Sequence, residues 1–150
     1  MMTLAGIDVV LQEVPGEVSL AVALAGCPNN CKDCHSPWLQ ARNIEVDGGV
    51  VDPAIVGSAL DKYQGLVTCL LLLGGEWDAR MASALLDEAL ARKLHTAMYA
   101  GTDVVPFEIR LRLTYLKTGR WNPALGGLGT MGTNQVLVDL RTKTEIKVGI

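Results

Sequence analysis

Three of the four cysteines in this chain stand within eight residues and follow the spacing C-x3-C-x2-C. They are Cys27, Cys31 and Cys34. In a reducing compartment, such crowding favours metal ligation over disulfide bonds. Three thiolates on one short loop can converge on a cube of iron and sulfide, which normally takes four thiolates. The motif therefore predicts a cluster in which one iron stays open to an outside ligand.

Zinc is the alternative metal for this loop. A structural zinc ion requires four tetrahedral ligands, and the loop offers three thiolates. His35 directly follows Cys34, but neighbours in sequence seldom both point at one ion. Cys69 lies in an apolar run, where we expect an inert buried thiol. The ligand count and spacing thus favour an iron–sulfur cluster and leave zinc as the second interpretation.

A second motif, Gly74-Gly75-Glu76, directly follows the apolar run Leu66–Leu73. Two glycines let a ligand approach the backbone closely and permit unusual φ angles. The adjacent carboxylate can accept hydrogen bonds from an ammonium group. An ordinary strand-to-helix turn with a solvated glutamate would have the same sequence. The motif becomes informative only through its position relative to the cysteines.

Two apolar runs position these motifs. Val18–Ala25 precedes the cysteines, and Leu66–Leu73 precedes the glycine pair. Continuous apolar runs of this length are typical of strands buried on both faces of a parallel sheet. Both motifs would then follow the carboxyl ends of strands, where the ligand sites of α/β folds gather.

Helices are expected between the strands. Asp52 is a plausible N-cap and Pro53 suits the first helical position. The apolar residues that follow share one helical face: Ile55, Val56, Ala59, Leu60 and Tyr63. We expect this helix to end near Gly65. A second helix is expected after Asp78, with Met81, Leu85, Ala89 and Leu90 at helical spacing.

The remaining sequence completes a single α/β domain over residues 1–150. His95–Tyr99 and Leu113–Lys117 read as strands, while Pro106 leaves the stretch Val104–Leu113 ambiguous. The glycine-rich stretch Trp121–Gly132 predicts a loop, and Gln135–Val148 predicts a terminal strand or hairpin. Alternation of strands and helices implies parallel βαβ units with right-handed crossovers.

Composition narrows the possible classes of protein. The chain has 150 residues, is 49% hydrophobic and has a formal net charge of −3, which fits one folded domain without the basic surface of a nucleic-acid binder. No apolar run reaches the roughly 18–20 residues of a membrane helix. The segment Met1–Leu11 lacks the basic start of a signal peptide. We therefore expect a cytoplasmic protein that binds neither nucleic acid nor membranes.

The cysteine spacing followed by Gly74-Gly75-Glu76 resembles the radical S-adenosylmethionine superfamily. The resemblance implies that the cysteines hold a four-iron, four-sulfur (4Fe-4S) cluster whose fourth iron is chelated by S-adenosylmethionine. It also implies that Gly74, Gly75 and Glu76 bind the amino group of the methionine moiety. One electron from the cluster would then cleave the sulfonium to give a 5′-deoxyadenosyl radical.

Within that superfamily, the chain is similar to the activating proteins of anaerobic ribonucleotide reductases. Five further segments support the similarity: Val14-Pro15-Gly16-Glu17, His35-Ser36-Pro37-Trp38, Tyr99-Ala100-Gly101-Thr102, Lys117-Thr118-Gly119-Arg120-Trp121 and Gly132-Thr133-Asn134-Gln135-Val136. The chain departs from the usual pattern at Asp33, where many members have an aromatic residue, and at Trp77, where many activators have proline. The stretch Val104–Leu113 is also shorter than the corresponding helix.

This similarity implies an open partial β/α barrel of mostly parallel strands. It implies hydrogen abstraction from a backbone glycine of the reductase large subunit, with a reductase or flavodoxin-like protein as electron donor. His35 and Asn134 would lie near the cofactor, and no side chain would act as a catalytic acid or base. For Trp38 and Trp77 we expect packing, and for His95 a place at a strand start.

Two alternatives remain. One is another radical S-adenosylmethionine enzyme, either the activator of a different glycyl-radical enzyme or a small-molecule synthase. The other is a non-enzymatic module that binds zinc or an iron–sulfur cluster.

Overall fold

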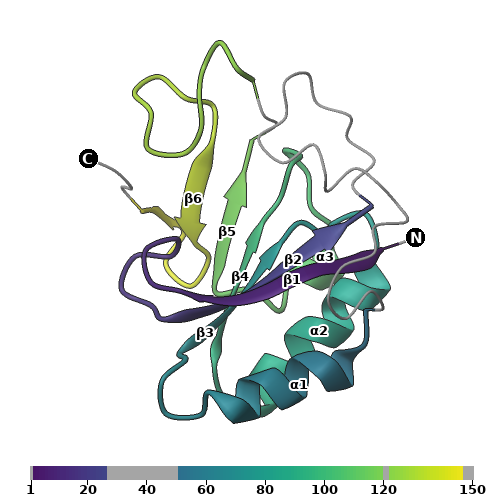
Figure 1. The fold of residues 1–150 in the computed structure, drawn as a ribbon. Coiled ribbons are helices and arrows are strands. Elements are labelled where there is room, and N and C mark those ends of the chain that lie inside the picture. Colours follow the sequence, from purple (N-terminus) through teal and green to yellow (C-terminus); the bar gives the residue numbers. More distant parts are fainter. Residues whose placement is uncertain (1, 27–50, 120–121, 147–150) are drawn as a thin grey trace.

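A computed structural model describes residues 2–26, 51–119 and 122–146 of the chain (Figure 1). These residues form one open seven-stranded sheet in the order β1-β2-β3-β4-β5-β6-β7. The strands are β1 (Thr3–Val10), β2 (Ser19–Ala25), β3 (Cys69–Leu73), β4 (His95–Tyr99), β5 (Tyr115–Thr118), β6 (Val136–Asp139) and β7 (Thr144–Glu145).

The centre of the sheet is parallel. Strands β2, β3, β4 and β5 pair in parallel, whereas β1 joins β2 and the pair β6–β7 joins β5 in antiparallel fashion. Antiparallel pairing of β6 with β7 confirms the predicted terminal hairpin. The α/β class with a parallel centre is likewise confirmed, and the sheet formed by the described residues is not closed into a barrel.

Three helices are described: α1 (Pro53–Lys62), α2 (Ala79–Ala91) and α3 (Phe107–Arg110). As predicted, Asp52 caps α1 with a 2.9 Å hydrogen bond from the Ala54 N–H group, and Pro53 occupies the first turn. The helices lie on one side of the sheet (Figure 1). The larger core fills the space between them, where Leu20, Leu70 and Leu85 are fully buried.

The opposite face of the sheet has a smaller core. Ala21, Cys69, Leu71, Ala97, Tyr115 and Leu137 are buried there. Val14 from the β1–β2 connection is fully buried against them, and Leu128 from the glycine-rich loop packs at the same cluster. Loops therefore cover this second face where helices cover the first.

Several predicted boundaries require correction. The run Leu66–Leu73 enters the sheet only at Cys69, because the chain first turns at Gly65, where φ is +87°, and leaves Leu66 exposed. In α2 the apolar face includes Leu86, which is fully buried, in place of Leu90, which is exposed. The ambiguous stretch after Pro106 forms the single-turn helix α3. Strand β1 has no counterpart among the predictions.

Among the described residues, no helix has both the length and the apolar character needed to cross a membrane.

Candidate functional site

The two motifs leave the sheet from neighbouring strands. In the parallel pairing of β2 with β3, Ala23 stands opposite Leu73. Gly26, the residue before the first cysteine, therefore follows the carboxyl end of one strand while Gly74 follows that of the next. Cys27, Cys31, Cys34 and His35 themselves lie outside the described residues, as does Trp38. What the structure describes is the starting point of the cysteine loop next to the Gly-Gly-Glu turn.

Both glycines of that turn are required by backbone shape and by space. Their φ angles are +91° at Gly74 and +102° at Gly75, a region that side-chain-bearing residues rarely adopt. A Cβ atom added to Gly75 would stand 2.8 Å from Leu24 Cδ1, and one added to Gly74 would stand 2.9 Å from the Trp77 ring. Leu24 belongs to β2, so the turn packs closely against the strand that leads to the cysteines.

Glu76 is buried at this edge and is only 7% exposed. Its Oε1 atom accepts a 3.0 Å hydrogen bond from the N–H group of Gly101, just beyond the end of β4. The interpretation of Glu76 as a solvated turn residue is therefore wrong. The backbone just after β4 thus holds the carboxylate that follows β3. The site therefore has a hydrogen-bond acceptor in a fixed position.

Helix α2 starts directly after the turn. The Asp78 N–H group donates to the Gly75 carbonyl over 3.1 Å, and the Asp78 carboxylate caps the Met81 N–H group, also over 3.1 Å. Trp77 packs partly buried against the larger core. The expected N-cap at Asp78 and the expected packing role of Trp77 are thus confirmed, and the helix start holds the turn in place.

Asn134 lies at the same edge of the sheet as the Gly-Gly-Glu turn, but it precedes β6, three strands further along. Its carbonyl oxygen would stand 2.6 Å from a Cβ added to Gly119, the residue that follows β5. The Asn134 side chain is exposed, whereas its neighbour Gln135 is buried and donates from Nε2 to the Gly119 carbonyl over 3.4 Å. The backbone at Asn134 and the side chain of Gln135 thus pack against the residue that follows β5.

A polar cluster at the opposite, amino edge of the parallel strands was not predicted. Glu17 is 8% exposed and precedes β2. Its Oε1 accepts a 2.7 Å hydrogen bond from Thr68, and its Oε2 stands 2.6 Å from both His95 Nδ1 and the Tyr115 hydroxyl. His95 does begin β4, as expected, but its role in this cluster depends on residues from four separate segments. The Pro15-Gly16 turn that presents Glu17 was the one sequence signal available.

Titration properties follow from this burial. Burial alone raises the pKa of the Glu17 carboxyl, but hydrogen bonds from Thr68, Tyr115 and His95 outweigh it and lower the pKa below its usual value. Burial, followed by the nearby Glu17 charge, raises the pKa of the Cys69 thiol to about 12. Cys69 is fully buried, so the prediction of a buried thiol is confirmed, and the raised pKa makes it a poor metal ligand.

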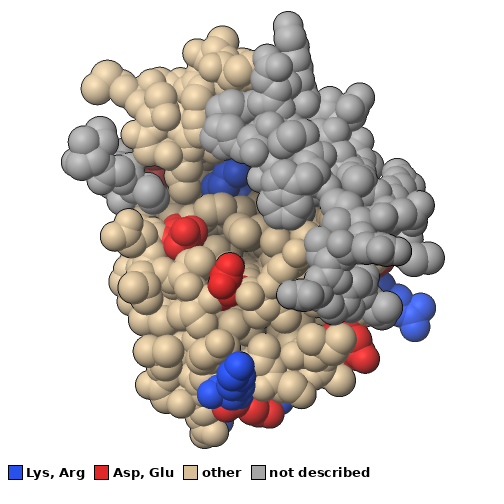
Figure 2. Space-filling model, in the orientation of Figure 1, with Lys and Arg blue, Asp and Glu red and all other residues tan. Residues whose placement is uncertain are grey.

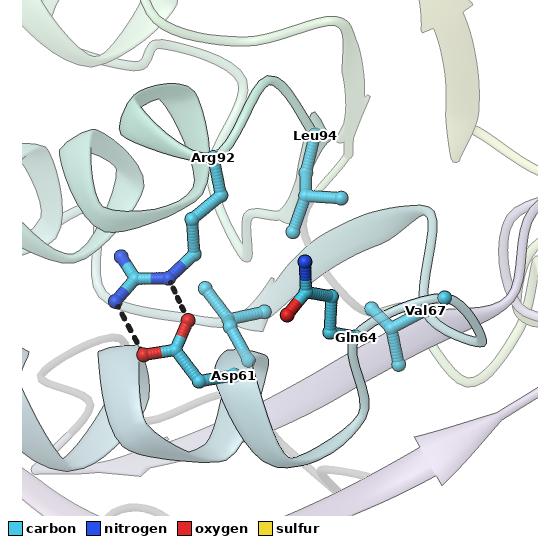
Figure 3. Close-up of a pocket in the computed structure, with 7 residues that line it drawn as sticks. Asp61, Gln64, Val67, Arg92 and Leu94 are labelled. Carbon is cyan, nitrogen blue, oxygen red and sulfur yellow. Dashed lines mark hydrogen bonds and ion pairs between the residues drawn. The ribbon is translucent and has the colours of Figure 1, made fainter.

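A hollow of about 180 Å³ lies at the ends of α1 and α2, next to the amino edge (Figure 3). Arg92 and Asp61 border it and form a two-pronged ion pair, with Nε–Oδ1 at 2.8 Å and Nη2–Oδ2 at 3.1 Å. Gln64, Val67 and Leu94 also line it. Its lining residues Val67 and Leu94 come just before β3 and β4 in the chain. The hollow therefore lies at the edge opposite to the Gly-Gly-Glu turn and is separate from the candidate site.

Within the described segments, no group of three or more His, Cys, Asp or Glu side chains could hold a metal ion. On the face drawn in Figure 2, the described acidic and basic side chains are dispersed among other residues and form no large patch of one sign. Comparisons of the chain with protein-family models, with curated proteins and with solved structures yielded no match.

Proposed function

We propose that this protein is a radical S-adenosylmethionine enzyme that generates a glycyl radical on the large subunit of an anaerobic ribonucleotide reductase. One observation supports this function above all others. The cysteine loop and the Gly-Gly-Glu turn leave the sheet from the adjacent carboxyl ends of β2 and β3, although they are far apart in sequence. A cluster and a ligand held by these two segments would be neighbours.

The residues present fit both groups. Three thiolates from Cys27, Cys31 and Cys34 match a cluster with one open iron better than they match a four-ligand zinc site. Glu76 offers a buried carboxylate at the neighbouring strand end, and carboxylates form strong hydrogen bonds with ammonium groups. We therefore assign the 4Fe-4S cluster to the cysteines and the amino group of S-adenosylmethionine to the turn of Gly74, Gly75 and Glu76.

When bound, the cluster and S-adenosylmethionine supply one-electron cleavage of the sulfonium, which gives the 5′-deoxyadenosyl radical that removes a hydrogen atom from glycine. The protein contributes binding, orientation and shielding. Gly101 fixes the Glu76 carboxylate through its N–H group, and the start of α2 at Asp78 fixes the turn. His35 and Asn134 are proposed to border the cofactor, and no side chain is assigned as an acid or base.

The finer fold assignment belongs to the same proposal. We infer that the sheet is an open partial β/α barrel, which is supported by its sequential strand order, its parallel centre and the described helices on one side. An open sheet leaves the carboxyl edge accessible to a loop of a large partner. The reductase large subunit, a reductase or flavodoxin-like electron donor and a cytoplasmic location complete the proposal.

The test combines metal analysis with turnover. The protein is reconstituted anaerobically with iron and sulfide, reduced, and incubated with S-adenosylmethionine in the presence or absence of an anaerobic ribonucleotide reductase. We expect about four iron and four sulfide per chain, formation of 5′-deoxyadenosine, and a glycyl-radical signal only when the reductase is present.

Single cysteine variants provide the matched control. Cys31→Ala is expected to abolish the four-iron cluster, whereas Cys69→Ala is expected to retain it, because Cys69 is buried away from solvent. About one zinc and no sulfide per chain would instead identify a zinc module. Cleavage of S-adenosylmethionine without any radical on the reductase would point to a different substrate.

A further inference from the structure

The buried Glu17 cluster at the amino edge contains a histidine, His95, whose two ring nitrogens face an acceptor on one side and a donor on the other. His95 Nδ1 stands 2.6 Å from Glu17 Oε2, and a carboxylate can only accept. The proton of the imidazole therefore lies on Nδ1. On the other side of the ring, His95 Nε2 stands 3.4 Å from Arg141 Nη1, which can only donate. With its proton on Nδ1, a neutral His95 would present the lone pair of Nε2 to the Arg141 donor.

Arg141 reaches the cluster from the turn between β6 and β7. It donates to Asp139 from Nε and Nη2 over 3.0 and 2.8 Å, and to the Tyr115 hydroxyl over 3.3 Å. Its side chain is 51% exposed. Arg141 can therefore leave the imidazole and still keep its two hydrogen bonds to Asp139 and its contact with water.

We propose that the His95–Arg141 contact is broken by protonation: a proton from solvent binds His95 Nε2, removes its acceptor and drives the Arg141 guanidinium away. Two cations would otherwise stand within hydrogen-bonding distance of each other. The turn between β6 and β7 then loses one of its attachments to β4. Strand β6 runs from the edge that carries Asn134 to the edge that carries Arg141, so the contact anchors the far end of that strand.

Among the described residues, the other titratable groups of this cluster keep their state when the imidazole gains a proton. Glu17 and Asp139 stay ionised, because hydrogen bonds hold the pKa of each carboxyl below its usual value. Burial and the Glu17 carboxylate raise the pKa of Tyr115 to about 12, so the phenol remains a donor. Cys69 next to Glu17 stays a thiol. Imidazole is the side chain whose charge ordinarily changes in the physiological range.

Nuclear magnetic resonance on the full-length chain tests the proposal. The imidazole nitrogens of His95 are assigned by their loss in His95→Gln, since the chain has 2 histidines. At pH 8 we expect the proton on Nδ1. The measured quantity is the guanidinium hydrogen-exchange rate of Arg141 divided by that of Arg92 in the same sample. On acidification, this ratio should rise severalfold as His95 gains its proton.

Arg92 is the internal standard because its guanidinium is held by the carboxylates of Asp61 and Glu88. In His95→Gln, the ratio of Arg141 to Arg92 exchange should stay constant with pH. A proton on Nε2 of His95 at pH 8 would overturn the proposal. So would a flat exchange ratio in the wild type, or an unchanged rise of that ratio in His95→Gln. If His95→Gln fails to fold, the position of the His95 proton at pH 8 and the pH dependence of the exchange ratio in the wild type still test the proposal.

Discussion

The Glu76 carboxylate is buried beside β3 and accepts a hydrogen bond from the Gly101 N–H group. In Glu76→Gln the amide oxygen can keep that bond, while the negative charge is lost. Hydrogen bonds to charged groups contribute about 1.5–3 kcal/mol, so we expect the Kd for S-adenosylmethionine to rise about tenfold or more. Anaerobic calorimetry on the reconstituted protein measures this change.

Glu108→Gln is the matched control, because Glu108 is exposed on α3. It should bind S-adenosylmethionine as tightly as the wild type. If Glu76→Gln also retains wild-type affinity, the amino group of the ligand is bound elsewhere.

Glu17 is the residue through which pH should act on stability. In Glu17→Gln the negative charge is lost and one acceptor oxygen becomes a donor, so the amide cannot accept from Thr68, His95 and Tyr115 together. We therefore expect a loss of about 1–3 kcal/mol in the free energy of unfolding at pH 7. The folded-state pKa of Glu17 is lowered, so its stabilisation is fully present above the pKa of the unfolded carboxyl. It is lost as the pH falls through the lowered pKa, because the unfolded chain takes up the proton first.

Urea unfolding at pH 7 and at pH 3 checks this prediction. The difference in the free energy of unfolding between the wild type and Glu17→Gln should be smaller at pH 3 than at pH 7. Glu108→Gln, a surface change, should stay within about 0.5 kcal/mol of the wild type at pH 7. A gap that stays constant or widens in acid would show that the Glu17 carboxylate is not stabilised by its hydrogen bonds.

At the residue scale, sequence reasoning succeeds where one short segment determines the outcome. The burial of Cys69 followed from its apolar neighbours. The burial of Glu76 did not, because its carboxylate is held by Gly101, which lies just beyond β4 and far from Glu76 in sequence. The Glu17 cluster was missed for the same reason, since its contacts with Thr68 and His95 join segments far apart in sequence.

Helix α2 couples the fold to the candidate site through its N-cap. Asp78→Ala removes the hydrogen bond to Met81 and should cost about 1 kcal/mol of unfolding free energy. Because α2 begins directly after the Gly-Gly-Glu turn, the same change should also weaken binding of S-adenosylmethionine. Thermal unfolding and calorimetry measure the two effects separately.

Asp52→Ala is the matched control, since Asp52 caps α1 in the same way. It should cost a similar amount of stability, about 1 kcal/mol, with no effect on ligand affinity. Equal losses of affinity in both variants would mean that the effect comes from general destabilisation.

At the element scale, caps and continuous apolar runs were the reliable signals. Asp52, Pro53 and Asp78 located the starts of both longer helices, and His95–Tyr99 was predicted with its observed bounds. Errors arose where tertiary packing determines which apolar residues are buried. Leu66 is apolar but lies in a turn. Leu90 is apolar but exposed, whereas Leu86 is buried in the larger core.

At the scale of the whole molecule, the parallel order of β2, β3, β4 and β5 gathers their carboxyl ends at one edge. The sequence predicted this arrangement, since strands alternated with helices. Curvature of the sheet could not be predicted, because it depends on how the strands twist and pack together. The open, unclosed sheet is what the described residues establish.

The central claim is that the three cysteines hold an iron–sulfur cluster with one iron open to S-adenosylmethionine. Electron paramagnetic resonance of the anaerobically reconstituted and reduced protein, recorded with and without S-adenosylmethionine, tests it most directly. We predict the signal of a reduced four-iron cluster whose g-values shift when S-adenosylmethionine is added. A spectrum that S-adenosylmethionine leaves unchanged, or a protein that assembles no four-iron cluster, would contradict the claim.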